Sequence, residues 1–214
     1  MSDLRKKDFK VTFLQTGDIP YIGIMSIAAV LKKNGFSTDV FSIDLENDVV
    51  KSILRSNPDM IACSAMTPTF KTIMRAIVAV KQKNPEIFVV VGGPHATFFP
   101  DAFNQEKNLD ALCVGEGEYP MLELASSLIN GERKTDIKNM WFRRNGDIVK
   151  NEIRDLIKDL DSLPFPDRDL YYKRYPFLSK RTIRFMMSRG CPFDCTYCTN
   201  KSLKDLYKGK GKFV

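Results

Sequence analysis

The chain of 214 residues is 43% hydrophobic and 28% charged, which is typical of a globular protein with one sizeable core and part of a second domain. Its longest apolar run, residues 22–30, is shorter than the roughly 20 residues that cross a bilayer, and the N-terminus carries no apolar export signal. We therefore expect a cytoplasmic protein without a membrane span, whose five cysteines are thiols or metal ligands rather than disulfides.

The first part of the chain alternates strand-like and helix-like segments with short connections. Strands are predicted at residues 11–17, 38–43, 59–66, 87–93 and 111–117, and helices at 22–34, 46–56, 70–84 and 120–130. Strands that are apolar throughout, separated by helices, are typical of a parallel sheet covered on both faces. We predict a doubly wound, Rossmann-like α/β domain with a five-stranded parallel sheet, within residues 1–135.

Glycine and polar residues follow four of these strands. Ligands of doubly wound sheets bind at the carboxyl ends of the strands, and glycine lets a ligand approach the backbone. The segments concerned are 16–23, 64–67, 92–95 and 115–118. At any single strand, glycine can equally serve to end the strand, but four such segments along one sheet edge favour a ligand site.

The chain then changes character. Residues 139–151 are predicted to form a small hairpin with Asn145-Gly146 as a type I′ turn. Residues 156–176 are proline-rich and polar, so residues 136–180 are interpreted as a hairpin and an ordered linker between domains. Residues 181–188 are predicted to form a new strand that opens a second, incomplete domain at 181–214.

Three cysteines lie close together in the run CPFDCTYC: Cys191, Cys195 and Cys198, with the spacing C-x3-C-x2-C. Three thiolates are able to hold three corners of an iron–sulfur cluster and leave one iron without a protein ligand. A structural zinc site usually needs four closing ligands, often as two C-x2-C pairs. Zinc remains an alternative, but the chain offers no second cysteine pair. Cys63 and Cys113 lie inside apolar strands and are interpreted as core residues.

The stretch RFMMSRGCPFDCTYC resembles the opening of the radical S-adenosylmethionine (SAM) superfamily, with its signature C-x3-C-x-Φ-C at the end of the first barrel strand. Tyr197 fills the aromatic position Φ. The resemblance implies a 4Fe-4S cluster on Cys191, Cys195 and Cys198, SAM bound at the open iron, and adenine beside Tyr197. It also implies an electron donor such as flavodoxin or ferredoxin. The Gly-Gly-Glu segment of that family is missing, so we expect that this chain by itself does not close a SAM site.

Residues 9–135 resemble the cobalamin-binding domains that precede many radical SAM barrels. The motifs of that group are D-x-H-x-x-G, S-x-L and G-G, and residues 18–23, 64–66 and 92–93 match them. The segments GGPHA and GEGE are typical of the radical SAM subgroup. The cofactor contacts that the resemblance implies are Thr16, Asp18, Pro20, Gly23, Ser64, Thr67, Gly92, Gly93, His95, Gly115 and Glu116.

Proline replaces the motif histidine at position 20. An imidazole there would be the lower axial ligand of cobalt, whereas proline offers no side-chain donor. We therefore expect cobalamin to bind without a histidine lower ligand. His95 follows the fourth strand rather than the first, and we expect it to contact the nucleotide tail or to fix its loop.

These resemblances imply the N-terminal portion of a cobalamin-dependent radical SAM enzyme, most commonly a methyltransferase acting on an unactivated centre of a small-molecule or natural-product substrate. Ring formation and rearrangement are other reactions of such enzymes. A first alternative is a non-catalytic cobalamin-binding sensor or carrier.

The second alternative, nucleic-acid binding or RNA modification, comes from the charge. Residues 173–214 carry 11 basic and two acidic residues, so the remaining chain sums to −2 of the net +7. We interpret this basic end either as a contact for nucleic acid or anionic ligands, or as charge that meets acidic groups on a part of the protein outside these 214 residues. Nucleic acid is the less favoured partner, because the segment has few aromatic residues and no folded nucleic-acid motif.

Overall fold

The computed structural model describes residues 9–181 and 183–212. Seven strands form one sheet in the order β2-β1-β3-β4-β5-β6-β7. The five parallel strands are β1 (Lys10–Gln15), β2 (Ser37–Ser42), β3 (Met60–Ser64), β4 (Phe88–Gly92) and β5 (Ala111–Cys113). The chain passes from β1 to β2 on one side and returns to β3 on the other, which creates a topological switch point at β1 and β3. The prediction of a doubly wound α/β domain is confirmed.

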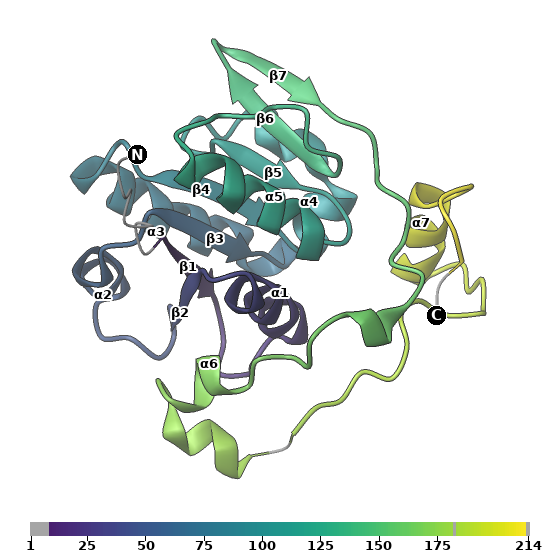
Figure 1. Ribbon diagram of the computed structural model, residues 1–214, viewed down its shortest axis with the longest axis horizontal. Coiled ribbons are helices and arrows are strands. Elements are labelled where there is room, and N and C mark those ends of the chain that lie inside the picture. The colour runs from purple at the N-terminus through teal and green to yellow at the C-terminus, as the bar shows by residue number, and fades with distance from the viewer. Residues whose placement is uncertain (1–8, 182, 213–214) are drawn as a thin grey trace, which may run out of the picture.

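Helices cover both faces of the sheet (Figure 1). The longer helices are α1 (Ile22–Lys33), α2 (Val49–Ser56), α3 (Phe70–Lys83), α5 (Glu118–Ile129) and α7 (Thr199–Leu206). Two short helices are α4 (Pro94–Phe98) and α6 (Asp169–Tyr172), and four 3-10 turns are η1 (Thr67–Thr69), η2 (Pro100–Asn104), η3 (Leu160–Ser162) and η4 (Pro176–Lys180). The four predicted helices, α1, α2, α3 and α5, start and end within a few residues of the predicted bounds, whereas α4 and α6 were not predicted.

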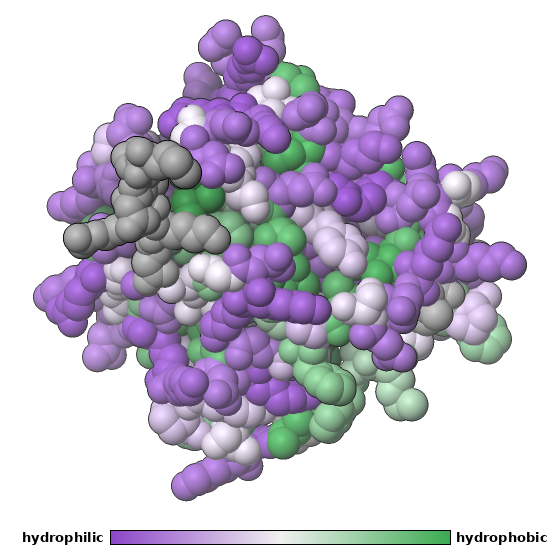
Figure 2. Space-filling model, viewed as in Figure 1, coloured by the Kyte–Doolittle hydropathy of each residue, from purple (hydrophilic) through white to green (hydrophobic). Residues whose placement is uncertain are grey.

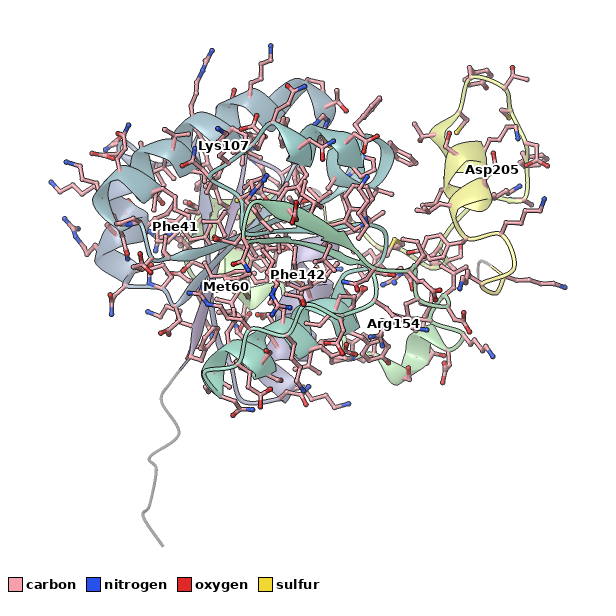
Figure 3. The ribbon with its side chains drawn as sticks, turned by 90° about the horizontal axis from the view of Figure 1, so that it is seen from above. Phe41, Met60, Lys107, Phe142, Arg154 and Asp205 are labelled. Carbon is pink, nitrogen blue, oxygen red and sulfur yellow. The ribbon has the colours of Figure 1, made fainter. Side chains whose placement is uncertain are left out.

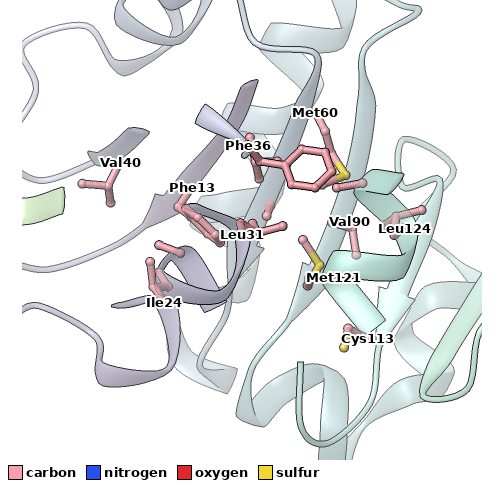
Figure 4. Packing of buried hydrophobic residues seen from close by; sticks show 14 of the residues in the cluster. Phe13, Ile24, Leu31, Phe36, Val40, Met60, Val90, Cys113, Met121 and Leu124 are labelled. Carbon is pink, nitrogen blue, oxygen red and sulfur yellow. The ribbon is translucent and has the colours of Figure 1, made fainter. Parts of the chain in front are cut away.

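Two apolar cores result, one on each face of the sheet. On one face, Ile24 of α1 and Met121 of α5 pack with Phe13 of β1 and Val90 of β4 (Figure 4). On the other face, α2, α3 and α4 pack on side chains of the same strands that point the opposite way, such as Leu14. Because both faces are covered, the strands read as continuously apolar in the sequence. On the face in Figure 2, hydrophilic residues cover most of the surface, with apolar residues between them.

The predicted hairpin forms, but it extends the sheet. It consists of β6 (Met140–Arg144) and β7 (Asp147–Lys150), and β6 pairs antiparallel with β5. Asn145 and Gly146 both have positive φ, 52° and 92°, as a type I′ turn requires. The expectation of five strands is thus corrected to seven. The physical reason is that β6 covers the open hydrogen-bonding edge of β5 and buries Met140 and Phe142.

The proline-rich segment after the hairpin is ordered, as expected, but it is not merely a linker. It crosses to the edge at β2 and α1, where α6 lies, before the chain returns to α7 (Figure 1). Leu170, Tyr171, Tyr175 and Leu178 are all buried in the core that contains α1 and α5. The interpretation of this segment as a linker between domains is therefore corrected: its aromatic residues complete the core of the α/β domain.

The strand predicted at residues 181–188 is not seen in its described residues, 181 and 183–188. Phe185 and Met187 are 78% and 96% exposed. An isolated extended segment has no neighbour for its backbone N–H and C=O groups, so the apolar pattern alone does not make it a strand. The chain forms the helix α7 directly after the cysteine loop, and Figure 3 shows Asp205 on this helix beside the body that contains Phe41, Met60 and Phe142. Across the described ranges, no helix is long and apolar enough to cross a membrane.

Candidate functional site

A cavity of about 550 Å³ lies at the carboxyl ends of β1, β3, β4 and β5, where the sequence predicts a ligand site. This volume is within the range of roughly 300–1,000 Å³ that small-molecule sites occupy. Its apolar wall consists of side chains from strands and helices: Phe13, Ile24, Ile27, Ala62, Val90 and Met121. Its glycines are Gly23, Gly92, Gly93, Gly115 and Gly117 of the α/β domain and Gly190 of the segment before the cysteine loop. The site is therefore an apolar hollow with a backbone-lined rim.

Gly93 shows why this rim needs glycine. Its φ is +88°, and a Cβ atom there would lie 2.8 Å from Ser64 Oγ and 2.9 Å from the Ala65 nitrogen. The loops after β3 and β4 are also joined by backbone hydrogen bonds, from Ala65 N–H to the Gly92 carbonyl at 3.0 Å and from His95 N–H to the Ala65 carbonyl at 2.9 Å. Residues 64–66 and 92–95 therefore form one closely packed edge.

Gly23 opens the rim on the side of α1. It lies in the first turn of that helix, and a Cβ atom there would have no neighbouring atom within 4 Å. The helix itself does not require glycine at this position, because Gly23 does not have a positive φ. Glycine here keeps the wall of the cavity free of side chains.

Six of the predicted cofactor contacts line this cavity: Gly23, Ser64, Gly92, Gly93, Gly115 and Glu116. Asp18 and Pro20 instead line a smaller cavity of about 170 Å³, near Arg168 and Arg181. The Arg181 guanidinium hydrogen-bonds Asp18 and holds the pKa of that carboxyl below its ordinary value. Thr16 is buried at the end of the first strand. The loop after β1 is thus separate from the cavity of about 550 Å³ at the carboxyl ends of the strands, which is called the main cavity from here on.

His95 and Thr67 lie behind the rim rather than in the cavity. The His95 ring stacks on Phe70 and Phe99, with centroids 4.0 and 5.6 Å away, and its Nδ1 is 3.2 Å from Thr67 Oγ1. Its Nε2 is buried and has no hydrogen-bond partner among the described residues. Burial lowers the pKa of His95, which favours the neutral ring. These contacts fit the expectation that His95 fixes its loop.

The GEGE segment carries the charge of the site. Arg189 reaches two carboxylates with its two terminal nitrogens, Glu116 Oε1 at 2.6 Å and Glu118 Oε1 at 2.5 Å. Glu118 is 4% exposed and also accepts a hydrogen bond from Ser26 Oγ at 2.8 Å. Burial alone would lower the pKa of Arg189, but the charges and hydrogen bonds of Glu118 and Glu116 outweigh it and raise this pKa above its ordinary value.

Tyr207 of the C-terminal segment closes one side of the cavity. Its hydroxyl oxygen accepts a hydrogen bond from Glu116 N–H at 2.7 Å and rests on Gly115, where a Cβ atom would lie 2.0 Å from it. Burial raises the pKa of Tyr207 to about 12. Arg189 and Tyr207 were not predicted as site residues, and Glu118 was included only as the last residue of the segment 115–118. A signal existed for Arg189 and Glu118, because acidic residues directly after a buried strand need cationic partners.

The three clustered cysteines are not gathered at one point. Cys195 is exposed, Cys191 and Cys198 are half-buried, and Tyr197 is 91% exposed. In the part of the chain that the structure describes, no three His, Cys, Asp or Glu side chains converge as a metal site. The donor set fits a cluster in its chemistry, but not in the arrangement seen here. Such loops are commonly organised by the metal itself, because ligand sites seldom form without it.

Cys63 and Cys113 are buried, as expected of core residues, and they also form part of the cavity floor. Burial raises the pKa of both thiols, for Cys113 to about 12 with a smaller contribution from the Glu118 charge. Both thiols therefore stay neutral. A neutral thiol is a weak ligand, so these two cysteines are apolar wall rather than metal donors.

The lysines of α7 have local partners. Lys204 bonds the carbonyls of Pro192 and Phe193 at 3.1 and 3.0 Å and the Asp194 carboxylate at 2.8 Å. Lys201 pairs with Asp205 one turn further along the helix, at 3.3 Å. Part of the positive charge of this segment therefore ties the cysteine loop to α7.

Residues 11–125 match the family model described as "B12 binding domain". Among curated proteins, the chain is 31% identical over 189 residues to an uncharacterized methyltransferase of Pyrococcus horikoshii, covering 85% of this chain and 40% of that protein. It is 30% identical over 196 residues to an anaerobic magnesium-protoporphyrin IX monomethyl ester cyclase of Rubrivivax gelatinosus, covering 86% of this chain and 35% of that protein. The chain thus spans well under half the length of these relatives.

Among solved structures, the fold is similar to that of the cobalamin-dependent S-adenosylmethionine radical enzyme OxsB with aqua-cobalamin and S-adenosylmethionine bound. The TM-score is 0.73 at 20% sequence identity, with 89% of this chain and 28% of that chain covered. This likeness supports the α/β fold and extends beyond the sheet to the segments that follow it.

Proposed function

The chain belongs to the B12-binding domain family, and from this premise we propose that its main cavity holds cobalamin for a radical SAM enzyme. The observation that carries the proposal is that the family match, residues 11–125, covers every strand and loop from the α/β domain that contributes glycine to the cavity rim. The cavity is formed by the carboxyl ends of parallel strands next to the switch point, where ligands of such sheets bind.

The residues present suit a large cofactor with a flat ring face. Gly23, Gly92 and Gly93 leave backbone at the rim, while Phe13 and Val90 offer an apolar floor. The chain has one histidine, His95, and its ring packs between Phe70 and Phe99 behind the rim. Pro20 has no side-chain donor to offer cobalt. Cobalamin bound here would therefore lack a histidine lower ligand.

We assign to Cys191, Cys195 and Cys198 the role of holding a 4Fe-4S cluster, whose open iron would bind SAM and supply radical chemistry when loaded. The thiols lie in one loop, between Arg189 at its start and Lys204 on α7. An electron donor such as flavodoxin or ferredoxin is required for that chemistry. The substrate is a small molecule or natural product.

For the reaction itself, methyl transfer is the first candidate. The Pyrococcus horikoshii relative is named a methyltransferase, while the Rubrivivax gelatinosus relative is named a cyclase. A non-catalytic cobalamin carrier is the second candidate function, favoured by the exposure of the cysteine loop. Iron and sulfide reconstitution separates the two, because the carrier needs no cluster.

Cobalamin binding is tested with hydroxocobalamin and the variant Gly23→Leu. Leucine suits a helix better than glycine, by about 0.8–1.0 kcal/mol, so this variant is expected to fold at least as well as the parent chain. Its side chain fills open space at the cavity wall, and an overpacking cost of about 1–3 kcal/mol weakens binding by about 10- to 100-fold. Affinity is measured from the change in cobalamin absorbance and from its retention in gel filtration.

The matched control is Lys33→Leu, which adds the same side chain at an exposed position in the last turn of the same helix. It should bind hydroxocobalamin like the parent chain. The proposal fails if the parent chain does not retain hydroxocobalamin, or if Gly23→Leu binds it as tightly as the parent does.

A further inference from the structure

Arg189 links the cysteine loop to the α/β domain at a single place. It lies two residues before Cys191, and its guanidinium contacts Glu116 and Glu118 of the loop after β5. Of its side chain, 16% is exposed, compared with 15% for Glu116 and 5% for Glu118. Since the two partners come from a region more than 70 residues earlier, this is a tertiary contact and not a local turn.

The contact has the chemistry of a strong and directional pair. A guanidinium that donates to two carboxylates is held in both position and orientation, which a single ammonium would not achieve. Neutral donors add to the contact: Glu116 Oε2 accepts from Ile157 N–H at 2.9 Å, and Glu118 Oε1, the oxygen that Arg189 contacts, also accepts from Ser26 Oγ at 2.8 Å. Without Arg189, two largely buried carboxylates would face each other with no cation between them.

A second contact ties the other end of the same segment to the same loop. Tyr207 lies just after α7, and its hydroxyl accepts a hydrogen bond from Glu116 N–H and rests on Gly115. The backbone of Leu156 then donates to the Lys210 carbonyl at 2.8 Å. The three cysteines thus lie on a stretch of chain whose two ends, Arg189 and Tyr207, are both fastened to residues 115–118.

We propose that Arg189 is a positioning residue: its double contact with Glu116 and Glu118 fixes the start of the cysteine loop at the mouth of the main cavity. Whatever the thiols hold would then lie beside whatever the cavity holds. The identity of the two cofactors, a cluster and cobalamin, rests on the proposed function. The contact between loop and domain does not, because it involves only residues of this chain.

The first test needs no cofactor. Amide hydrogen exchange is measured by mass spectrometry for peptides from residues 186–212 in the parent chain, in Arg189→Gln and in Arg184→Gln. Arg184 is the matched control, because it is an arginine of the same segment before the cysteine loop, and among the described residues no hydrogen bond or ion pair joins its side chain to Glu116 or Glu118. We expect exchange in α7 to rise about tenfold or more in Arg189→Gln, as for the loss of a hydrogen-bonded charge pair, and to stay unchanged in Arg184→Gln.

Two further variants keep the test decisive if Arg189→Gln folds poorly. Arg189→Lys retains the charge but not the fork, so its exchange should lie between those of the parent and Arg189→Gln. Glu118→Gln removes the charge from the other partner and still offers an oxygen to Ser26. Exchange in α3 reports on the folding of the domain and should be the same in all variants. Equal exchange of α7 in the parent, Arg189→Gln and Glu118→Gln would overturn the proposal.

The second test asks about position. The chain is loaded with cobalamin and reconstituted with iron and sulfide, and both centres are reduced to paramagnetic states. The microwave power that half-saturates the cobalt(II) signal increases when a fast-relaxing cluster is close. Arg189→Gln should lower this power at equal cofactor content, and Arg184→Gln should not.

The two tests separate the two ideas. An unchanged half-saturation power in Arg189→Gln would refute the positioning role, even if exchange had increased. If neither cofactor binds the parent chain while exchange still responds to Arg189→Gln, the proposed function fails and the contact between loop and domain stands.

Discussion

Replacing Tyr171 with phenylalanine tests whether the segment after the hairpin belongs to the core of the α/β domain. Tyr171 is 1% exposed, and its hydroxyl donates to Gln15 Oε1 and accepts from Tyr21 N–H at 3.3 Å. Gln15, at the end of β1, is itself 1% exposed. Burial raises the pKa of Tyr171, so the hydroxyl keeps its proton and remains a donor at all ordinary pH values.

The size of the effect follows from what the substitution leaves behind. Phenylalanine keeps the ring packing and removes only the hydroxyl. The side-chain oxygen Oε1 of Gln15 then stays buried without the donor that Tyr171 supplies. A buried polar group that loses its partner costs about 1–3 kcal/mol of the free energy of unfolding. With a urea m-value of about 2–3 kcal/mol/M, the unfolding midpoint should fall by about 0.5–1 M.

Urea unfolding followed by far-ultraviolet circular dichroism measures this change. Tyr172→Phe is the control, because Tyr172 is adjacent and only half-buried, and its hydroxyl has no hydrogen-bond partner among the described residues. It should leave the midpoint unchanged within error. If Tyr171→Phe also leaves the midpoint unchanged, the segment is not part of the cooperative core and the reasoning is refuted.

Three further predictions concern the site. Burial lowers the pKa of His95 in the folded chain, so the unfolded chain binds more protons and the free energy of unfolding falls as the pH drops below about 6.5. His95→Gln should therefore reduce the dependence of the melting temperature on pH between pH 7.5 and 5.5. An unaltered pH dependence would contradict this prediction. Gly115→Ala places a Cβ atom at a residue with φ +81° and against the Tyr207 hydroxyl, so chymotrypsin should release the C-terminal segment faster from this variant than from Gly131→Ala. Gly131 is the control, because its φ is +72° but a Cβ atom there would have open space around it. Equal cleavage rates would argue against the contact between Tyr207 and Gly115. Cys195→Ala should abolish the absorbance of a reconstituted cluster while Cys63→Ala retains it, and loss in both or neither would exclude the ligand assignment.

The elements of the parallel sheet could be predicted because their signal is local. Strands such as β3 and β4 are short apolar runs that end at a serine or a glycine. The rim of the cavity followed from topology, since the carboxyl ends of parallel strands share one edge. That is why Gly23, Ser64 and Gly93 could be expected near one another, and all three line the cavity.

What the sequence did not disclose depends on partners that are distant along the chain. Tyr171 and Tyr175 read as part of a polar linker, yet they bury their rings against β1 and β2, more than 130 residues away. The stretch around Phe185 has the pattern of a strand but no neighbouring strand to pair with. The apolar pattern of a segment shows only that it is able to form a strand. Whether it does so depends on a neighbouring strand that pairs with its backbone.

Several arginines in the basic end of the chain form ion pairs with carboxylates of the α/β domain. Arg174 contacts Glu46 at 3.2 Å, Arg181 contacts Asp18, and Arg189 contacts Glu116 and Glu118. Each of these pairs joins an arginine from the basic end to a carboxylate at the carboxyl edge of the sheet. The excess of positive charge after residue 172 and the acidic balance before it are therefore two halves of one electrostatic fit, in which arginines bring the last part of the chain onto the edge where the cavity lies. Nucleic-acid binding would need a surplus of cations free of such partners, and the arginines that lie nearest the cavity do not supply it.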